Sequence, residues 1–558
     1  MIKLRNQVLC CICAIAMIFS GCAKDFSLRD KDTDASDKTT EQVEPSATEP
    51  IETITSETIP EVQKPLSLGV NLEGPADWGV SWPLNDIMKL SRAFFTQNQV
   101  WVDGGINAWD TEAFSQIPIG DNGYPLELPA DIKGMESPQI ITTVWANTES
   151  MPEGDYQVYY DGKGKIEFGF DAVGEDLGDG RMIMHLTYKD NIASMSIVES
   201  SGADPIHNIR IYVPGADPEE LFNPVFLEKC EPFSLLRMMD WGATNFSTLS
   251  DWSDRATAED ITFTSGKGYP YEYMIELSNQ LHKDVWICIP HLATDEYIKN
   301  LSELLFENLD PDLNVYIEYS NEVWNWMFDQ TNYLYENGDA GVDWPERIVP
   351  FIQNALDVFY DSWPGDKSRV SRVVGVQVGW YDVCERIVLS MREGSFEIIS
   401  PTSYFGFDEE AIQALEEAGS SADNALLEEI ALDSVESIGT EIEKVADLCN
   451  RLGVKMAYYE GGQHFTPDPF GSEQDYGQAL IDIQHDPSMY DVYMKWFEEL
   501  EKIKVDANGD TTLCVLFTLA SPDSDRYGSF GLFTDLYHDV DIDTIPKYKA
   551  VKDYMENE

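Results

Sequence analysis

Short apolar runs that alternate with longer amphipathic segments fill most of the chain after residue 223. The runs begin at Phe233, Asp284, Asn314, Val373, Phe396, Val454 and Thr512, and an earlier run covers residues 66–72. Near-continuous apolar runs of this length are typical of parallel strands that are buried on both faces. The sequence therefore predicts eight strands of one parallel sheet.

Helical patterns lie between most of these strands. They cover residues 270–283, 294–309, 346–363 and 423–452, and a shorter one at 84–95 follows the first strand. Eight strands that alternate with helices favour the α/β class, as a (β/α)₈ TIM barrel with its helices outside. A doubly wound open sheet is the alternative, but no glycine-rich dinucleotide-binding loop follows the first strand.

The sequence pattern between residues 102 and 214 differs from that of the rest of the chain. Short β-rich segments such as "QIITTVWA" and "RMIMHLTYK" are separated by Gly, Asp and Asn, which are hairpin signals. We expect an inserted all-β, sandwich-like module at 102–214. The catalytic barrel would then comprise residues 65–101 and 215–558.

The N-terminus carries a candidate export signal. Lys3 and Arg5 precede an apolar run at residues 8–19, which is shorter than the ~20 residues of a spanning helix. The following Ser-Gly-Cys resembles a bacterial lipobox, which implies a lipoprotein signal peptide at 1–22 and lipidation of Cys22. The protein would then be a secreted lipoprotein, anchored by lipid to the extracellular face of a bacterial cell membrane. An ordinary cleaved signal or an uncleaved anchor is the alternative.

Residues 23–64 are rich in Thr, Ser, Glu, Asp and Pro and poor in large apolar residues. Such a segment cannot bury enough apolar surface to fold. We expect a disordered acidic linker that holds the barrel away from the membrane.

Charge and cysteine usage exclude several classes of partner. The chain has 100 acidic and 37 basic residues, a formal net charge of −63. Such a surface repels nucleic acid and anionic lipid headgroups, so we expect neither as a partner. The five cysteines beyond the leader are scattered singly, without CxxC or metal-ligand spacing, and predict free thiols and no metal site; they are Cys230, Cys288, Cys384, Cys449 and Cys514.

In a TIM barrel the carboxyl ends of the strands build the active site. Here those ends are polar and aromatic, whereas the strand interiors are apolar. In strand order, from the second to the eighth, the ends carry Arg237 and Asp240; His291; Asn321, Glu322 and Trp324; Gln377, Trp380 and Tyr381; Tyr404; Glu460; and Ser521 and Asp523.

Glu322 and Glu460 stand at the ends of the fourth and seventh strands. Two carboxyl groups that face each other across a pocket can cleave a glycosidic bond, one as proton donor and one as nucleophile or base. Either residue could instead be one of many solvated loop carboxylates, and the position at two strand ends is what argues against that. Trp324 and Trp326 would raise the pKa of Glu322 by excluding water, whereas pairing with Arg237 would make Glu460 more acidic.

The motifs "YSNEVWN" and "YYEGG", with Arg237 on strand two and Tyr404 on strand six, resemble the clan A glycoside hydrolases. The resemblance implies Glu322 as acid/base and Glu460 as nucleophile. It implies further that Asn321 binds the sugar 2-hydroxyl, and that Arg237 and Tyr404 position the nucleophile.

Three more residues are expected to bind substrate. His291 matches a histidine that several clan members carry after strand three. Trp324 and Trp380 are the aromatic residues that we expect to stack on sugar rings, although such residues are also common in packed cores. With "LGVNLEGPADW" and "LLRMMDWGATN", the chain also resembles a group of bacterial secreted proteins of this clan.

These features favour a glycoside hydrolase that acts on a polysaccharide or oligosaccharide by a retaining double displacement. A β-glycosidic linkage is implied by the clan alone. We expect a monomer that needs no cofactor and whose partner is its carbohydrate substrate. The alternatives are a non-catalytic surface glycan-binding lipoprotein, or a structural barrel in which only the β module binds glycan.

Overall fold

The computed structural model describes residues 65–556 apart from 101–108, 469–470, 472 and 506–511. The expected signal peptide at 1–22 with Cys22, and the linker at 23–64, lie outside the described residues and stay predictions. Among the described helices, none is both long and apolar enough to cross a membrane.

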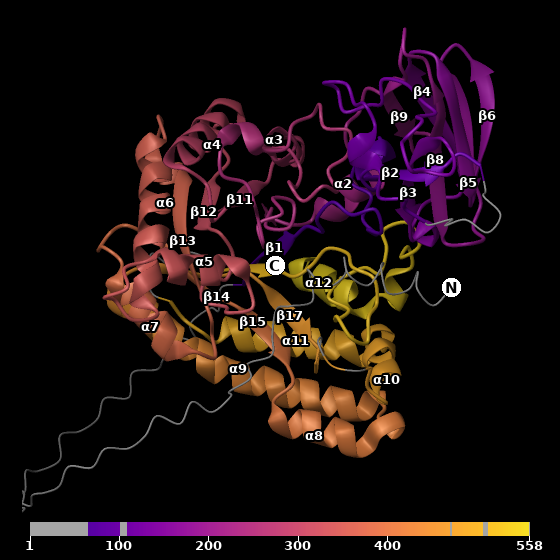
Figure 1. Cartoon of the computed structure of the whole chain (residues 1–558). Helices are drawn as coiled ribbons and strands as arrows, with labels where there is room; N and C mark the ends of the chain where they lie inside the picture. The colour runs from indigo at the N-terminus through magenta and orange to yellow at the C-terminus, as the bar shows by residue number, and fades with distance from the viewer. Residues whose placement is uncertain (1–64, 101–108, 469–470, 472, 506–511, 557–558) are drawn as a thin grey trace, which may run out of the picture.

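Eight parallel strands close into a barrel, as the sequence predicts (Figure 1). The ring closes where the first strand pairs with the last, with Val70 beside Leu516. In order around the barrel the strands are β1 (Ser67–Asn71), β10 (Leu235–Arg237), β11 (Asp284–Ile289), β12 (Val315–Tyr319), β13 (Val370–Val376), β14 (Ile398–Pro401), β16 (Lys455–Tyr458) and β18 (Leu513–Leu516).

Helices lie around the strands and come close to the expected bounds. Thr294 caps the N-terminus of α4 by accepting from the Tyr297 N–H, and the long α9 stops at Gly453, whose φ of 69° is left-handed. The helices are α2 (Pro224–Cys230), α3 (Tyr271–Leu281), α4 (Asp295–Asn308), α5 (Asp329–Asn337), α6 (Val349–Ser362), α7 (Tyr381–Ser390), α8 (Glu409–Ala418), α9 (Asn424–Leu452), α10 (Gly477–Asp482), α11 (Ser488–Glu501) and α12 (Pro546–Glu556).

The inserted module holds two four-stranded antiparallel sheets, which Figure 1 shows beside the barrel at the upper right. One sheet has the order β2–β3–β8–β5 and the other β6–β7–β4–β9. Their bounds are β2 (Phe95–Asn98), β3 (Gln139–Ala146), β4 (Gly154–Asp161), β5 (Gly164–Phe170), β6 (Ala172–Gly178), β7 (Arg181–Leu186), β8 (Ile192–Ser200) and β9 (His207–Tyr212).

Two expectations near the start of the module need correction. The predicted helix at 84–95 is only a 3-10 turn, η1 (Ile87–Leu90), because the backbone becomes extended at Ser91 and the Trp145 indole donates to the Ile87 carbonyl. Strand β2 follows and pairs with β3, so the module begins before the expected boundary at residue 102. The apolar residues of this segment pack on the module instead of forming an amphipathic helix.

Side chains of the barrel strands alternate between two cores. Inward-facing residues form a cluster inside the barrel, and outward-facing ones join the larger core beneath the helices. On β12, Val315, Ile317 and Tyr319 belong to the outer core, whereas Tyr316 packs on the inner cluster. By the same alternation Glu318 faces the barrel interior.

A small parallel sheet extends the carboxyl ends of two strands. It pairs β15 (Ser403–Gly406) with β17 (Gly461–His464), with Tyr404 beside Gly462. A Cβ on Gly406 would lie 2.6 Å from the His464 carbonyl oxygen of the paired strand, so glycine lets the two strands approach this closely. This sheet fixes the backbone that carries Tyr404 and Glu460.

Candidate active site

Arg237, the last residue of β10, joins the ends of several strands inside the barrel. It is fully buried. Its Nη1 donates to Glu460 Oε1 at 2.7 Å and to Asn71 Oδ1 at 3.0 Å. Its Nη2 donates to Glu318 Oε2 at 2.8 Å and to Asn321 Oδ1 at 2.9 Å. One guanidinium therefore serves two carboxylates and two amides, a geometry that suits its planar fork.

Glu318 is a buried carboxylate within strand β12, and its neighbours stabilise its charge. Besides its ion pair with Arg237, Oε2 accepts from Trp286 Nε1 at 3.0 Å. On the neighbouring strand Gly375 leaves room for it, because a Cβ there would lie 2.6 Å from Oε1. Glu318 thus supplies the second negative charge that holds Arg237 in place.

Glu460 lies two residues beyond the end of β16 and is fully buried. Arg237 pairs with one of its oxygens, and the Tyr404 hydroxyl donates to the other at 3.0 Å. Burial raises the pKa of Glu460, but the Arg237 charge and the Tyr404 hydroxyl act in the opposite direction. Both of its oxygens are thus stabilised in the charged form.

Glu322 lies beyond the end of β12 on a backbone that leaves the strand abruptly. Ser320 and Glu322 have φ values of 57° and 45°, in the left-handed region that non-glycine residues rarely adopt. The Tyr459 hydroxyl donates to its Oε1 and Asn325 Nδ2 to its Oε2, both at 2.8 Å. Burial and then the Glu460 charge raise the pKa of Glu322 well above its usual range.

The two glutamates are therefore chemically unlike. Glu460 has a buried cation on one oxygen, whereas Glu322 has only neutral donors and a nearby negative charge. The pKa of Glu322 is therefore raised further than that of Glu460, which makes Glu322 the better proton donor of the pair. Such a division suits a proton donor and a nucleophile.

Asn321 joins the same network between the two glutamates. While its Oδ1 accepts from Arg237, its Nδ2 donates to Asn245 Oδ1 at 3.2 Å. Gln330 Nε2 binds both the Asn321 carbonyl at 2.9 Å and Asn245 Oδ1 at 2.8 Å. The Asn321 side chain is therefore held with its Oδ1 toward the Arg237 guanidinium and its Nδ2 toward Asn245.

The three other expected binding residues lie differently. His291 follows β11 and its ring is 5.4 Å from that of Tyr333; burial lowers its pKa to about 4. Trp324 is buried in the outer core. Trp380, which precedes α7, is 43% exposed. In the described part of the chain, no hydrogen bond joins His291 or Trp380 to either glutamate.

Sequence reasoning did not single out Tyr459 and Asn325, the two donors to Glu322. Their signals are present but weak: Tyr459 precedes Glu460 directly, and Asn325 follows Glu322 by three residues.

Glu73 and Asp240 are two further acidic residues that the sequence does not single out as site residues. They line a cleft of about 60 Å³ with Trp78, Phe517, Tyr527 and Phe530. This cleft adjoins the glutamates, since the Glu460 charge raises the pKa of Asp240.

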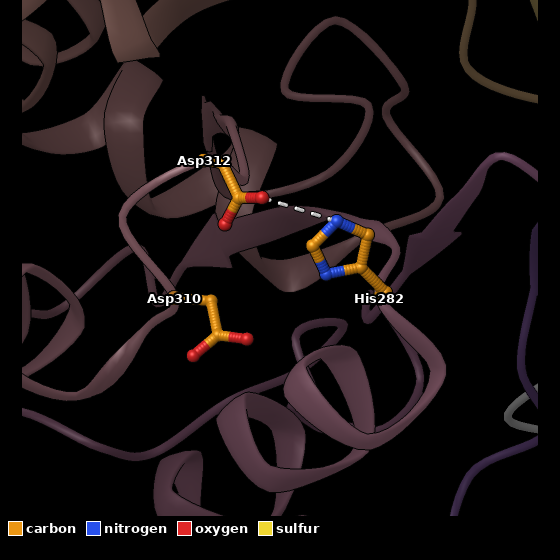
Figure 2. Close-up of side chains that lie close together, drawn as sticks. All are labelled: His282, Asp310 and Asp312. Atoms are coloured by element: carbon orange, nitrogen blue, oxygen red, sulfur yellow. Dashed lines mark ion pairs between the residues drawn. The ribbon is translucent and has the colours of Figure 1, made fainter.

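A second group of side chains lies at the opposite ends of the strands (Figure 2). His282 follows α3, and Asp310 and Asp312 precede β12; their ligand atoms lie within 4.8 Å of one another. His282 Nε2 is 3.2 Å from Asp312 Oδ2. His282 and Asp312 are largely exposed, and nothing else at this surface indicates a ligand among the described residues.

Several of the solved structures that resemble this fold are glycoside hydrolases by name. A GH51 arabinofuranosidase from Xanthomonas axonopodis pv. citri aligns with 61% of this chain and 67% of its own, at a TM-score of 0.39 and 13% identity. A family 51 α-L-arabinofuranosidase from Bifidobacterium longum aligns over 56% and 63%, at 0.37 and 12%. A family 1 β-glucosidase from Thermotoga maritima aligns over 59% and 85%, at 0.32 and 12%.

No protein-family model matches the sequence, and no curated protein matches it significantly. TM-scores this far below 0.5 carry no functional conclusion. The chemistry of the site rests on the residues of this chain.

Proposed function

We propose that the protein is a glycoside hydrolase that retains the configuration of the sugar it releases. The observation that supports this best is the unlike pair of buried glutamates at two strand ends, Glu460 on the Arg237 guanidinium and Glu322 on neutral donors. A carboxylate that serves only a structural ion pair needs no second, protonated carboxyl group beside it. Cleavage of a glycosidic bond needs such a proton donor.

In the first step Glu322 donates its proton to the glycosidic oxygen, and that oxygen leaves with the aglycone. The Glu460 carboxylate attacks the anomeric carbon, and an ester bond to the sugar forms as the C–O bond breaks. Tyr404 and Arg237 hold the two Glu460 oxygens, so little reorganisation is needed. We assign to Asn321, which shares the Arg237 guanidinium with Glu460, the role of binding a hydroxyl of the same sugar.

In the second step the roles of Glu322 reverse. Once Glu460 is an ester it is neutral, and the charge that raised the pKa of Glu322 is gone. The Glu322 carboxylate then takes a proton from water, whose oxygen attacks the anomeric carbon and releases Glu460. Tyr459 and Asn325 stabilise this charged form of Glu322.

The substrate that we propose is a β-linked polysaccharide or oligosaccharide. A panel of β-glucans, mannans and xylans, assayed for new reducing ends, tests the proposal. Wild type should cleave at least one polymer. Glu322→Gln and Glu460→Gln should each lower the rate by roughly 10²–10⁴-fold or more, because each removes a whole catalytic function.

A matched control is Glu397→Gln. Glu397 pairs with Arg372 at 2.6 Å near the opposite ends of the strands, as Glu460 pairs with Arg237. This variant should retain the wild-type rate. Glycan binding without cleavage by wild type would instead identify a binding protein, and full activity of both site variants would refute the proposed roles.

A further inference from the structure

The cleft beside the glutamates lies where three loops meet, those after β1, β10 and β18. The first contributes Glu73 and Trp78, the second Asp240, and the third a run of residues from Phe517 to Phe530. The Phe517 and Phe530 rings both lie 6.4 Å from the ring of Tyr404. Because Tyr404 binds Glu460, the cleft borders the proposed point of bond cleavage.

The lining of the cleft limits which part of a substrate it can hold. Neither Glu322 nor Glu460 is among the residues that line it. A sugar bound at the glutamates would therefore reach the cleft through one of its ring substituents. The aromatic lining suits the apolar part of such a substituent.

The two carboxyl groups of the cleft differ in their hydrogen bonds. Glu73 is satisfied internally, because its Oε2 accepts from the Val80 and Ser81 N–H groups at 3.0 Å and from the Ser81 hydroxyl at 2.8 Å. No side-chain hydrogen bond or ion pair joins the Asp240 carboxyl group to another described residue. Asp240 is therefore the acceptor that remains open toward the cleft.

We propose that the cleft seats an uncharged hydroxyl-bearing substituent of the sugar, such as its hydroxymethyl group, and excludes a carboxylate at the same place. The substituent would donate a hydrogen bond to Asp240. With Asp240 ionised, a carboxylate there would lie among Asp240, Glu73 and Glu460, without a donor from the Asp240 side chain. Specificity for neutral sugars over uronic acids would thus arise from repulsion as much as from attraction. The inference rests on the proposed function.

The protonation of the cleft agrees with this crowding of negative charge. Burial, and then the Glu460 charge, raise the pKa of Asp240 to about 7. Burial likewise raises the pKa of Glu73 to about 7, against the hydrogen bonds from Ser81 and Val80. The repulsion of a further anion is therefore greatest above pH 7, where both carboxyl groups are ionised, and it weakens below that pH, where they are protonated.

The test compares matched ligands on a catalytically inactive chain. At a pH well above 7, where Asp240 is ionised, Glu322→Gln protein is titrated calorimetrically with β-1,4-linked gluco-, manno- and galacto-tetraoses, and with counterparts whose C6 groups are oxidised to carboxylates. At least one neutral tetraose should bind, and its oxidised counterpart should bind about tenfold or more weakly. In the same background Asp240→Asn should reduce that ratio several-fold.

Overall charge is the competing explanation, since the whole chain repels anions. Asp284→Asn controls for it, because Asp284 begins β11 at the opposite end of the barrel and the substitution changes the net charge equally. It should leave the ratio unchanged. Equal binding of both ligands, binding of neither, or equal effects of the two Asp substitutions would overturn the inference. Discrimination in binding without hydrolysis by wild type would refute only the proposed function.

Discussion

At the scale of single residues, the proposed chemistry depends on the unlike environments of Glu322 and Glu460. Both glutamates can be selected from sequence because each breaks an apolar strand pattern at its end. The Tyr459 donor to Glu322 cannot be selected in this way, because Tyr458 and Tyr459 are adjacent and alike. Only the strand's orientation turns Tyr459 inward, to Glu322, and Tyr458 outward, to the helix side.

Tyr404→Phe tests the donor to Glu460. Without this hydroxyl the Glu460 carboxylate loses a donor, so its pKa rises and a higher pH is needed to ionise it. A hydrogen bond to a charged group contributes about 1.5–3 kcal/mol, which corresponds to roughly 1–2 pH units. The acidic limb of the kcat/KM profile should move up by that amount.

The basic limb, which reports Glu322, should stay in place in the Tyr404→Phe profile. Tyr156→Phe is the matched control, because Tyr156 is also buried but donates to the Pro152 carbonyl within the β module. Its profile should match that of wild type. An acidic limb that does not move in Tyr404→Phe would show that Glu460 is not the group that must be ionised.

At the scale of elements, Arg237 unites the ends of the strands. It binds Asn71 at the end of β1, Glu318 on β12 and Glu460 beyond β16. The strands themselves are predictable because burial on both faces leaves a continuous apolar run. The structure of the segment at 84–95 is not predictable in this way. Its apolar residues contact the β module, and no local sequence pattern specifies where that module lies.

Arg237→Met should lower the free energy of unfolding by about 3–5 kcal/mol, since it leaves two buried carboxylates without their cation. Urea denaturation measures this loss. The double variant Arg237→Met, Glu318→Gln should recover part of this lost stability, because it removes one of the two buried carboxylates that lack a cation. Arg451→Met, which breaks a half-exposed pair with Glu385, should cost only about 0–1 kcal/mol. Equal losses for the two arginines would contradict the central role of Arg237.

At the scale of the whole molecule, barrel closure brings together residues that no sequence window contains. Glu73 and Phe530 lie at opposite ends of the barrel sequence and line one cleft, because β1 pairs with β18. The β module helps to hold the first of these loops, since Arg92 pairs with Asp77 at 2.6 Å and the Asp77 carbonyl accepts from Ala146. Sequence therefore predicts the barrel and places the two glutamates at its strand ends, but it does not predict the shape of the cleft.

The central claim is that Glu460 attacks the sugar and Glu322 exchanges the proton. Its most direct test uses Glu322→Ala and Glu460→Ala chains with an aryl glycoside of the sugar that wild type releases, in the presence of azide. Azide is an anion small enough to occupy the space of a lost carboxylate. Proton NMR of the glycosyl azide products reports the configuration at the anomeric carbon.

In Glu322→Ala the aryl group leaves without a proton, and azide then displaces Glu460, so the product should keep the configuration of the substrate. In Glu460→Ala azide itself attacks from the opposite side, so the product should have the inverted configuration. The reverse assignment, or recovery of neither variant by azide, would contradict the roles assigned to the two glutamates.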